Sequence, residues 1–127
     1  MLKAFTALGC SIKPSDVVLE IGPGYGRIYQ TFRERFQFKK WYMVDINPKI
    51  CDFLSQKFKG DDRCQILCQD VNELELPEMF DVGISTLTFK HLYPDFSQAL
   101  ARIAHYIRDD GIFLFDMIPP LGGQARS

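Results

Sequence analysis

The sequence predicts an α/β fold in which a parallel β-sheet carries helices on both faces. Short apolar runs typical of buried parallel strands alternate with amphipathic helical patterns along the chain. The first run leads into a turn with three glycines, and a helical pattern follows at once. Three of the runs end in an acidic residue or are followed directly by one. With 127 residues, 46% of them hydrophobic, the chain is long enough for one packed domain spanning residues 1–127.

The N-terminal half contains three predicted helices and three predicted strands. We expect a short helix within residues 1–11 that ends at Gly9, and a first strand that begins at Val17. A helix over about residues 26–36 should turn Ile28, Phe32 and Phe36 toward the sheet. The remaining elements of this half are a strand over 41–45, a helix over 48–59 with Ile50, Phe53, Leu54 and Phe58 inward, and a strand over 64–69.

The C-terminal half continues the alternation. A short acidic connection over 72–78 precedes a strand over 80–85. The next helix is expected to open near Pro94 and to end at Asp109-Asp110-Gly111, followed by a fifth strand over 112–118 and a flexible tail over 119–127. Right-handed crossovers arrange these strands in the order 3-2-1-4-5. The fifth strand then forms an open edge, which we expect to be covered by a second copy in a homodimer, by the tail, or by a segment missing from this chain.

A ligand site is predicted at the carboxyl ends of the strands, at the topological switch point between the neighbouring strands 1 and 4, from which the chain connections run in opposite directions. Glycines in the turn after the first strand let the backbone approach a ligand, and the following helix directs its free N–H groups to it. The dinucleotide fingerprint requires glycine at positions 22, 24 and 27, but Arg27 occupies the last and the third glycine is Gly26. This register disfavours a nicotinamide-dependent oxidoreductase.

An acid at the end of the second strand, Asp45, lies about 20 residues after the glycine turn, where a carboxylate can bind both hydroxyls of a ribose. The alternative is a cap for the next helix. Asn47 and Pro48 already supply the N-cap and first-turn residues of that helix, so ribose binding is the favoured interpretation.

These motifs resemble those of class I methyltransferases that depend on S-adenosylmethionine (SAM). The segment E-I-G-P-G-Y-G at 20–26 resembles their motif I, written [DE]-x-G-x-G-x-G, and Asp45 resembles the second motif. Asp70-Val71 resembles the third, and F-D-V-G-I-S-T-L-T-F-K-H-L at 80–92 resembles the fourth motif of members acting on small molecules. The resemblance covers about residues 12–118 and implies a Rossmann-like sheet. Members usually continue with an antiparallel hairpin, order 3-2-1-4-5-7-6, so this chain resembles one truncated after strand five.

The resemblance also implies roles for individual residues. Glu20 would bind the amino end of the methionine moiety, Asp45 the ribose, and Asp70 the adenine amino group. The other positions implied at the cofactor are the glycines Gly22, Gly24 and Gly26, the adenine walls Ile46 and Val71, and Ser85 and Thr86 near the sulfonium.

Two further residues have open roles. Tyr25, beside the glycines, either closes over the methionine end or packs against neighbours. His91 is a candidate general base, although an ordinary hydrogen-bonded loop histidine is the commoner case.

Composition limits the partners. The formal net charge of −1 gives no reason to expect a nucleic-acid or anionic-membrane surface. The [DNS]-P-P-[YF] loop of nucleic-acid amino-methyltransferases is absent after the fourth strand, which counts against a ribosomal RNA dimethylase, although E-I-G-P-G-x-G also occurs in that group. Four cysteines without C-x-x-C spacing and two histidines predict free buried thiols and no metal site. No long apolar segment or signal peptide is visible, so we expect a cytoplasmic protein outside the membrane.

The sequence thus predicts an enzyme that transfers a methyl group from SAM to a small-molecule acceptor, with S-adenosylhomocysteine (SAH) as the second product. The alternative is a truncated module that binds SAM or SAH but is non-catalytic or depends on a partner.

Overall fold

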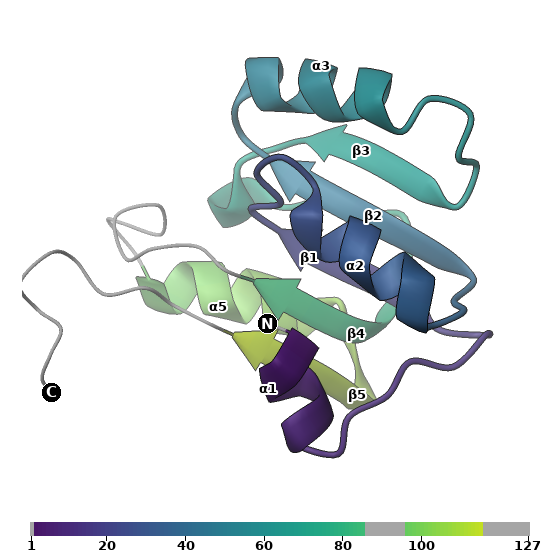
Figure 1. Ribbon diagram of the computed structural model, residues 1–127. Coiled ribbons are helices and arrows are strands. Elements are labelled where there is room, and N and C mark those ends of the chain that lie inside the picture. The colour runs from purple at the N-terminus through teal and green to yellow at the C-terminus, as the bar shows by residue number, and fades with distance from the viewer. Residues whose placement is uncertain (1, 86–95, 116–127) are drawn as a thin grey trace, which may run out of the picture.

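Five parallel strands form one sheet in the order β3-β2-β1-β4-β5, as predicted (Figure 1). The computed structural model describes residues 2–85 and 96–115. The strands are β1 (Val17–Ile21), β2 (Lys40–Asp45), β3 (Cys64–Cys68), β4 (Phe80–Ser85) and β5 (Ile107–Phe115). β1 pairs with β2 on one side and β4 on the other, and all five of its residues are buried. A continuous apolar run suits this central position because both faces of the strand are covered.

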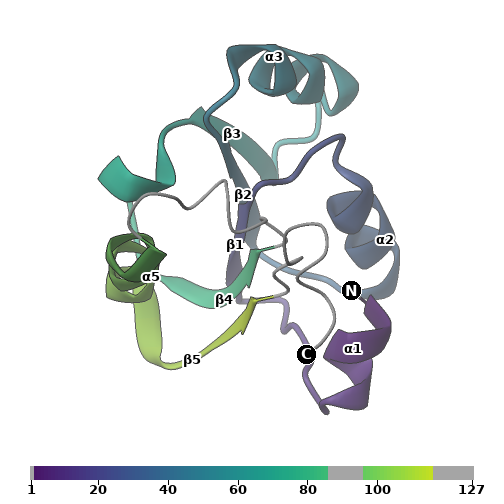
Figure 2. The same cartoon turned by 90° about the vertical axis from the view of Figure 1, so that its left-hand side faces the viewer.

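Helices cover both faces of the sheet (Figure 2). One face carries α1 (Leu2–Ala7), α2 (Arg27–Arg35) and α3 (Pro48–Lys57), and the other carries α5 (Phe96–His105) and the short 3-10 helix η1 (Val71–Glu73). The side chains of β1 point to the two faces of the sheet and so belong to two separate cores. Val18 joins the core beneath α1, α2 and α3, whereas Leu19 and Ile21 join the core beneath α5.

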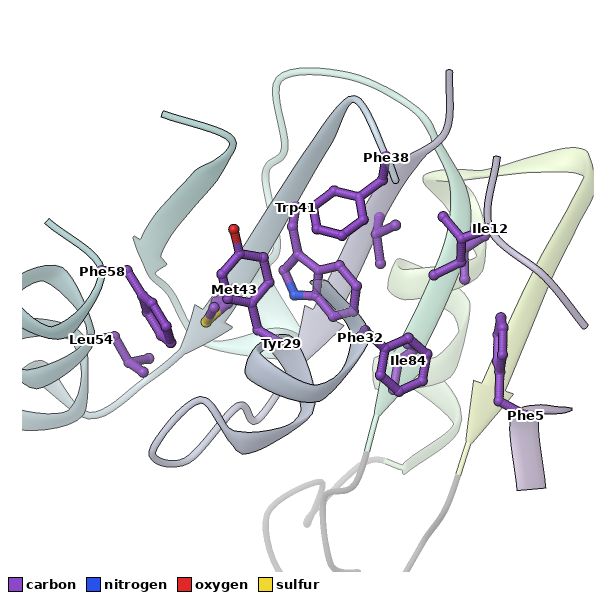
Figure 3. Packing of buried hydrophobic residues seen from close by; sticks show 12 residues of the cluster. Phe5, Ile12, Tyr29, Phe32, Phe38, Trp41, Met43, Leu54, Phe58 and Ile84 are labelled. Carbon is purple, nitrogen blue, oxygen red and sulfur yellow. The ribbon is translucent and has the colours of Figure 1, made fainter. Parts of the chain in front are cut away.

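An aromatic cluster fills the core beneath α2 (Figure 3). The Trp41 ring lies 5.3 Å from the ring of Tyr29, 5.7 Å from that of Phe32 and 5.2 Å from that of Phe38. The prediction for the inner face of this helix is confirmed at Phe32, which is fully buried, and Ile28 and Phe36 pack half-buried against the same core. The prediction missed Tyr29, which is also fully buried. Tyr29 tolerates burial because its hydroxyl donates a hydrogen bond to Asp61 Oδ2.

The prediction for α3 was wrong at Phe53, whose side chain is 42% exposed. Its ring packs edge-on against the ring of Tyr25, with 5.1 Å between centroids. The helix is also shorter than expected and ends at Lys57. Leu54 and Phe58 are buried as predicted.

Strand β5 begins at Ile107, five residues before the predicted start, and α5 ends at His105. The Asp-Asp-Gly stretch that was expected to end the helix lies within β5, at an irregularity in the pairing between Phe80 and Val82 of β4. Beside this irregularity, Arg108 Nε of β5 forms an ion pair with Asp81 Oδ1 of β4 at 3.1 Å. The interaction joins two distant segments, so local turn signals could not show it.

Several expectations concern residues outside the described ranges, including Pro94, the end of strand five at 116–118, and the tail at 119–127. In residues 2–85 and 96–115, no helix has the length and apolar character needed to cross a membrane. Among the described strands β5 pairs only with β4, and the covering of its free edge stays a prediction.

Candidate ligand-binding site

A cavity of about 400 Å³ lies at the carboxyl ends of β1, β2 and β3. Six of the predicted site residues line it: Gly22, Gly24, Asp45, Ile46, Asp70 and Val71. They come from three separate strand ends, and the parallel register brings those ends to one edge of the sheet. The cavity therefore lies at the predicted carboxyl edge of the sheet, but on the side of β1, β2 and β3. Among the described residues that line it none belongs to β4, although the site was predicted between strands 1 and 4.

The glycines of the turn have different surroundings. Gly22, Gly24 and Gly26 all have positive φ angles of 74°, 56° and 83°, which L side chains adopt at a cost. A Cβ atom on Gly24 would meet nothing within 4 Å, whereas one on Gly26 would lie 2.6 Å from Cε2 of Phe58. Gly24 thus borders open space at the cavity. Gly26 does not line the cavity, and it lets α2 pack closely against α3.

Asp45 presents a half-buried carboxylate at the end of β2. Its Oδ1 accepts a hydrogen bond from the backbone N–H of Asn47 at 2.9 Å. Asn47 itself caps α3, because its side chain accepts from the backbone N–H of Lys49 at 2.9 Å. Among the described residues, no hydrogen bond to Oδ2 of Asp45 is present, so this oxygen can accept from a ligand.

Asp70 is oriented in a similar way just beyond the end of the neighbouring strand β3. Its Oδ1 accepts from the backbone N–H of Asn72 at 2.9 Å and from the Asn72 side chain at 3.3 Å, which caps η1. The neighbouring Gln69 holds the loop by two 2.9 Å hydrogen bonds: its Nε2 donates to the Glu75 carbonyl and its Oε1 accepts from the Glu75 N–H. The loop that presents Asp70 and the buried Val71 is therefore fixed at both ends.

Two other predicted site residues, Tyr25 and Ser85, do not line the cavity. Tyr25 is 60% exposed and packs against Phe53. Ser85, at the end of β4, is fully buried beside Ile21 of β1. Thr86 and His91 are outside the described residues.

Glu20 is fully buried beneath α2 and does not line the cavity. Trp41 Nε1 donates a hydrogen bond to its Oε1 at 3.0 Å, whereas its Oε2 has no partner among the described residues. Burial raises the pKa of this carboxyl group to about 7, and the bond from Trp41 lowers it only in part. A half-satisfied buried carboxyl group of this kind favours the protonated form near neutral pH.

We expect stability to fall with rising pH because of Glu20. In the unfolded chain this carboxyl ionises near pH 4.5, whereas in the folded chain it holds its proton to about pH 7. The folded state therefore binds more protons in this window, and the free energy of unfolding decreases through it, by on the order of 3 kcal/mol at most. Urea unfolding between about pH 5 and pH 8 measures this. Glu20→Gln should flatten the dependence, whereas Glu34→Gln, at an exposed position, should keep it. A parent chain with pH-independent stability contradicts the assignment.

Five cavity residues were not among the predicted site residues: Ile21, Val44, Asn47, Ile50 and Gln69. The first two are the last apolar residues of β1 and β2, and the others flank the two aspartates or open α3. The signal in the sequence that could have identified these lining residues is their position close to the acidic residues at the strand ends. Within the described residues, no three His, Cys, Asp or Glu side chains come together as a metal site requires.

Comparisons with known proteins agree with this geometry. Residues 19–115 match the family model described as a methyltransferase domain. The chain is similar to the malonyl-[acyl-carrier protein] O-methyltransferase of Anoxybacillus flavithermus, with 33% identity over 104 residues, 82% of this chain and 39% of that protein. It is also similar to the dimethyladenosine transferase of Kluyveromyces lactis, with 39% identity over 82 residues, 62% of this chain and 25% of that protein.

Among solved structures, the fold is similar to that of an S-adenosylmethionine-dependent methyltransferase from Clostridium acetobutylicum. The TM-score is 0.70 at 18% sequence identity, over 90% of this chain and 46% of that one. This likeness concerns the fold. The present chain spans less than half the length of each of these three proteins.

Proposed function

Since this chain belongs to the methyltransferase domain family, which its residues 19–115 match, we propose that it is an enzyme that transfers a methyl group from SAM to a small-molecule acceptor. The observation that carries the proposal is the cavity, which brings the glycine turn, Asp45 and Asp70 together at one edge of the sheet. A nucleoside requires this set: a carboxylate for the ribose hydroxyls, an acceptor for the adenine amino group, and a backbone that can come close to the remaining chain.

The cofactor has one orientation in this proposal. Asp45 accepts from the ribose hydroxyls through the carboxylate oxygen that Asn47 leaves open. Asp70 accepts from the adenine amino group, and Ile46 and Val71 flank the ring. The methionine moiety lies along the turn at Gly22 and Gly24. The sequence also assigns Glu20 to that end, but its carboxyl group is buried under Trp41 and does not line the cavity.

Methyl transfer from a sulfonium requires few catalytic groups from the protein. The transfer is a direct displacement with a neutral leaving group, so alignment of donor and acceptor supplies most of the rate, on the order of 7–11 kcal/mol for well-oriented reactants. A base is needed only where the acceptor must lose a proton. Ser85 and Thr86 near the sulfonium, and His91 as that base, are part of the proposal from the sequence.

A small-molecule acceptor is supported by the sequence after β4. The segment Ser85-Thr86-Leu87-Thr88 has no Pro-Pro pair to hold a flipped base, and the net charge of −1 gives no reason to expect a phosphate-binding surface. The names of the similar proteins refer to different acceptors, malonyl-[acyl-carrier protein] in one and dimethyladenosine in the other, so they leave the acceptor class open. A cytoplasmic location is also proposed, supported by four cysteines that are free thiols in the structure.

Isothermal titration of the chain with SAH, and with NAD as control, tests the cofactor. We expect binding of SAH with a micromolar dissociation constant and no binding of NAD. Absence of SAH binding would overturn the proposal for this chain. Transfer of a labelled methyl group to a panel of small acids, amines and adenosine-containing RNA then tests the acceptor.

The second candidate is a module that binds SAM or SAH without transferring the methyl group unless a partner or further segment is present. The chain covers 39% of one relative and 25% of another, which favours this candidate. SAH binding without transfer to any acceptor in the panel would support it over the enzyme.

A further inference from the structure

Two cysteines meet behind the wall of the cavity. Cys51 belongs to α3, and Cys68 is the last residue of β3. The Sγ of Cys51 donates to the carbonyl oxygen of Asp45 at 3.5 Å, and the Sγ of Cys68 donates to that of Ile46 at 3.7 Å. These carbonyls belong to adjacent peptide units, and the pairing of β2 with β3 sets Cys68 beside Asp45. The two thiols therefore face the same short segment, and Cys68 is close enough to Cys51 to help raise the pKa of its thiol.

The two thiols differ in access. Cys68 is exposed, whereas the side chain of Cys51 is 7% exposed. Burial raises the pKa of the Cys51 thiol to about 12, and the neighbouring Cys68, Asp45 and Asp52 act in the same direction. Cys51 is therefore protonated in the resting protein and is a poor first nucleophile. An oxidant in solution meets Cys68 first, with a second thiol held in place behind it.

We propose that Cys51 and Cys68 form a reversible disulfide in exchange with low-molecular-weight disulfides such as oxidised glutathione, and that this bond weakens binding at the cavity. The effect on the cofactor rests on the proposed function, whereas the bond itself does not.

The exchange proceeds in two steps. The Cys68 thiolate attacks one sulfur of oxidised glutathione, which breaks its S–S bond and releases one glutathione thiolate. Cys51 gives up its proton to solvent and attacks Cys68 Sγ in the mixed disulfide, which releases the second glutathione thiolate. Two protein thiols are oxidised, one glutathione disulfide is reduced, and the two protons end on the two glutathione thiols.

The bond must distort the cavity wall. Sulfurs that are not bonded stay about 3.5–4 Å apart, whereas a disulfide holds them at about 2.05 Å. Either α3 or the end of β3 absorbs this movement, and these elements carry the lining residue Ile50 and lead into the lining residue Gln69. The bond also removes the two S–H donors from the Asp45 and Ile46 carbonyls. Both changes act on the segment that presents the Asp45 carboxylate.

The experiment compares the reduced chain with the same chain after treatment with oxidised glutathione. Peptide mapping under non-reducing conditions should find the Cys51 and Cys68 peptides linked. Titration with SAH should show binding about tenfold weaker in the oxidised sample, a size usual for coupling between two sites, and restored by dithiothreitol. Cys68→Ser should remove the response to oxidation, Cys51→Ser should retain glutathione on Cys68, and Cys10→Ser should behave as the parent.

The outcomes separate the two proposals. Absence of the linked peptide overturns the disulfide, whatever the chain binds. A linked peptide with unchanged SAH affinity overturns the effect on the cavity. Failure of the reduced chain to bind SAH overturns the proposed function and the cofactor effect together, and the peptide map still decides whether the bond forms.

Discussion

Replacing Asp45 with alanine is expected to weaken SAH binding by two to four orders of magnitude. A hydrogen bond to a charged group contributes about 1.5–3 kcal/mol, and the carboxylate is proposed to accept from two ribose hydroxyls, which gives about 3–6 kcal/mol. Asp45 lies at the end of β2 in the cavity wall, with one oxygen already used by the Asn47 N–H. Isothermal titration of parent and variant measures the difference.

Two further variants make the Asp45 result specific. Asp45→Asn keeps an oxygen to accept from the Asn47 N–H but loses the charge, so it should preserve the turn before α3 and still bind SAH more weakly than the parent. Asp52→Ala removes an exposed carboxylate from α3, outside the cavity lining, and should leave the affinity unchanged. Equal SAH affinity in Asp45→Ala and the parent, with both folded by circular dichroism, would contradict ribose binding by Asp45.

The sheet order and the position of the site were predictable because both follow from periodicity and chain order. Buried runs at regular spacing, joined by right-handed crossovers, allow few arrangements of five parallel strands. Once the order is set, residues that end β1, β2 and β3 must share an edge, so Gly22, Asp45 and Asp70 converge without any knowledge of side-chain packing. In a parallel sheet, the residues at the strand ends therefore predict where the site lies better than they predict the individual contacts within it.

Contacts between distant segments were not predictable. The start of β5 lies where the strand pairs with Phe80 of β4, next to an ion pair between Arg108 and Asp81, whereas the Asp-Asp-Gly stretch by itself is typical of a turn. The proximity of Cys51 and Cys68 depends on the register of β3 against β2 and on the direction in which α3 leaves β2. Cys68 was expected to be buried and is exposed, because β3 is the edge strand on its side of the described sheet.

The role of Glu20 shows the limit of a motif. An acid two residues before the first glycine predicted a group facing the ligand, but alternation along β1 turns its side chain beneath α2, toward Trp41. Glu20 matches the motif in residue type and in its spacing from the glycines. The face of β1 on which its side chain lies determines where the carboxyl group is, and the motif does not specify that face. The same alternation places Leu19 and Ile21 on the face covered by α5.

Gly26→Ala is expected to destabilise the fold by about 2–5 kcal/mol. The left-handed backbone at φ 83° costs an alanine about 1–2 kcal/mol, and the new Cβ, 2.6 Å from Phe58 Cε2, adds an overpacking cost of about 1–3 kcal/mol. Phe58 cannot easily move away, because its ring is held 5.0 Å from the Tyr29 ring with the Arg33 guanidinium at 5.4 Å. Most single domains are stable by only about 5–15 kcal/mol, so the loss is a large share. Urea unfolding measures it.

Gly60→Ala is the matched control, because Gly60 has a similar φ of 90° but a Cβ there would meet nothing within 4 Å. It should cost only the backbone part, about 1–2 kcal/mol. Phe58→Leu in the Gly26→Ala background should recover part of the loss, since a smaller side chain makes room for the Cβ. Equal costs at Gly26 and Gly60 would mean that the third glycine of the turn is required for its backbone angle alone. A larger cost at Gly26, relieved at Phe58, would mean that the turn is glycine-rich for two separate reasons: Gly24 borders the cavity, and Gly26 lets α2 and α3 pack.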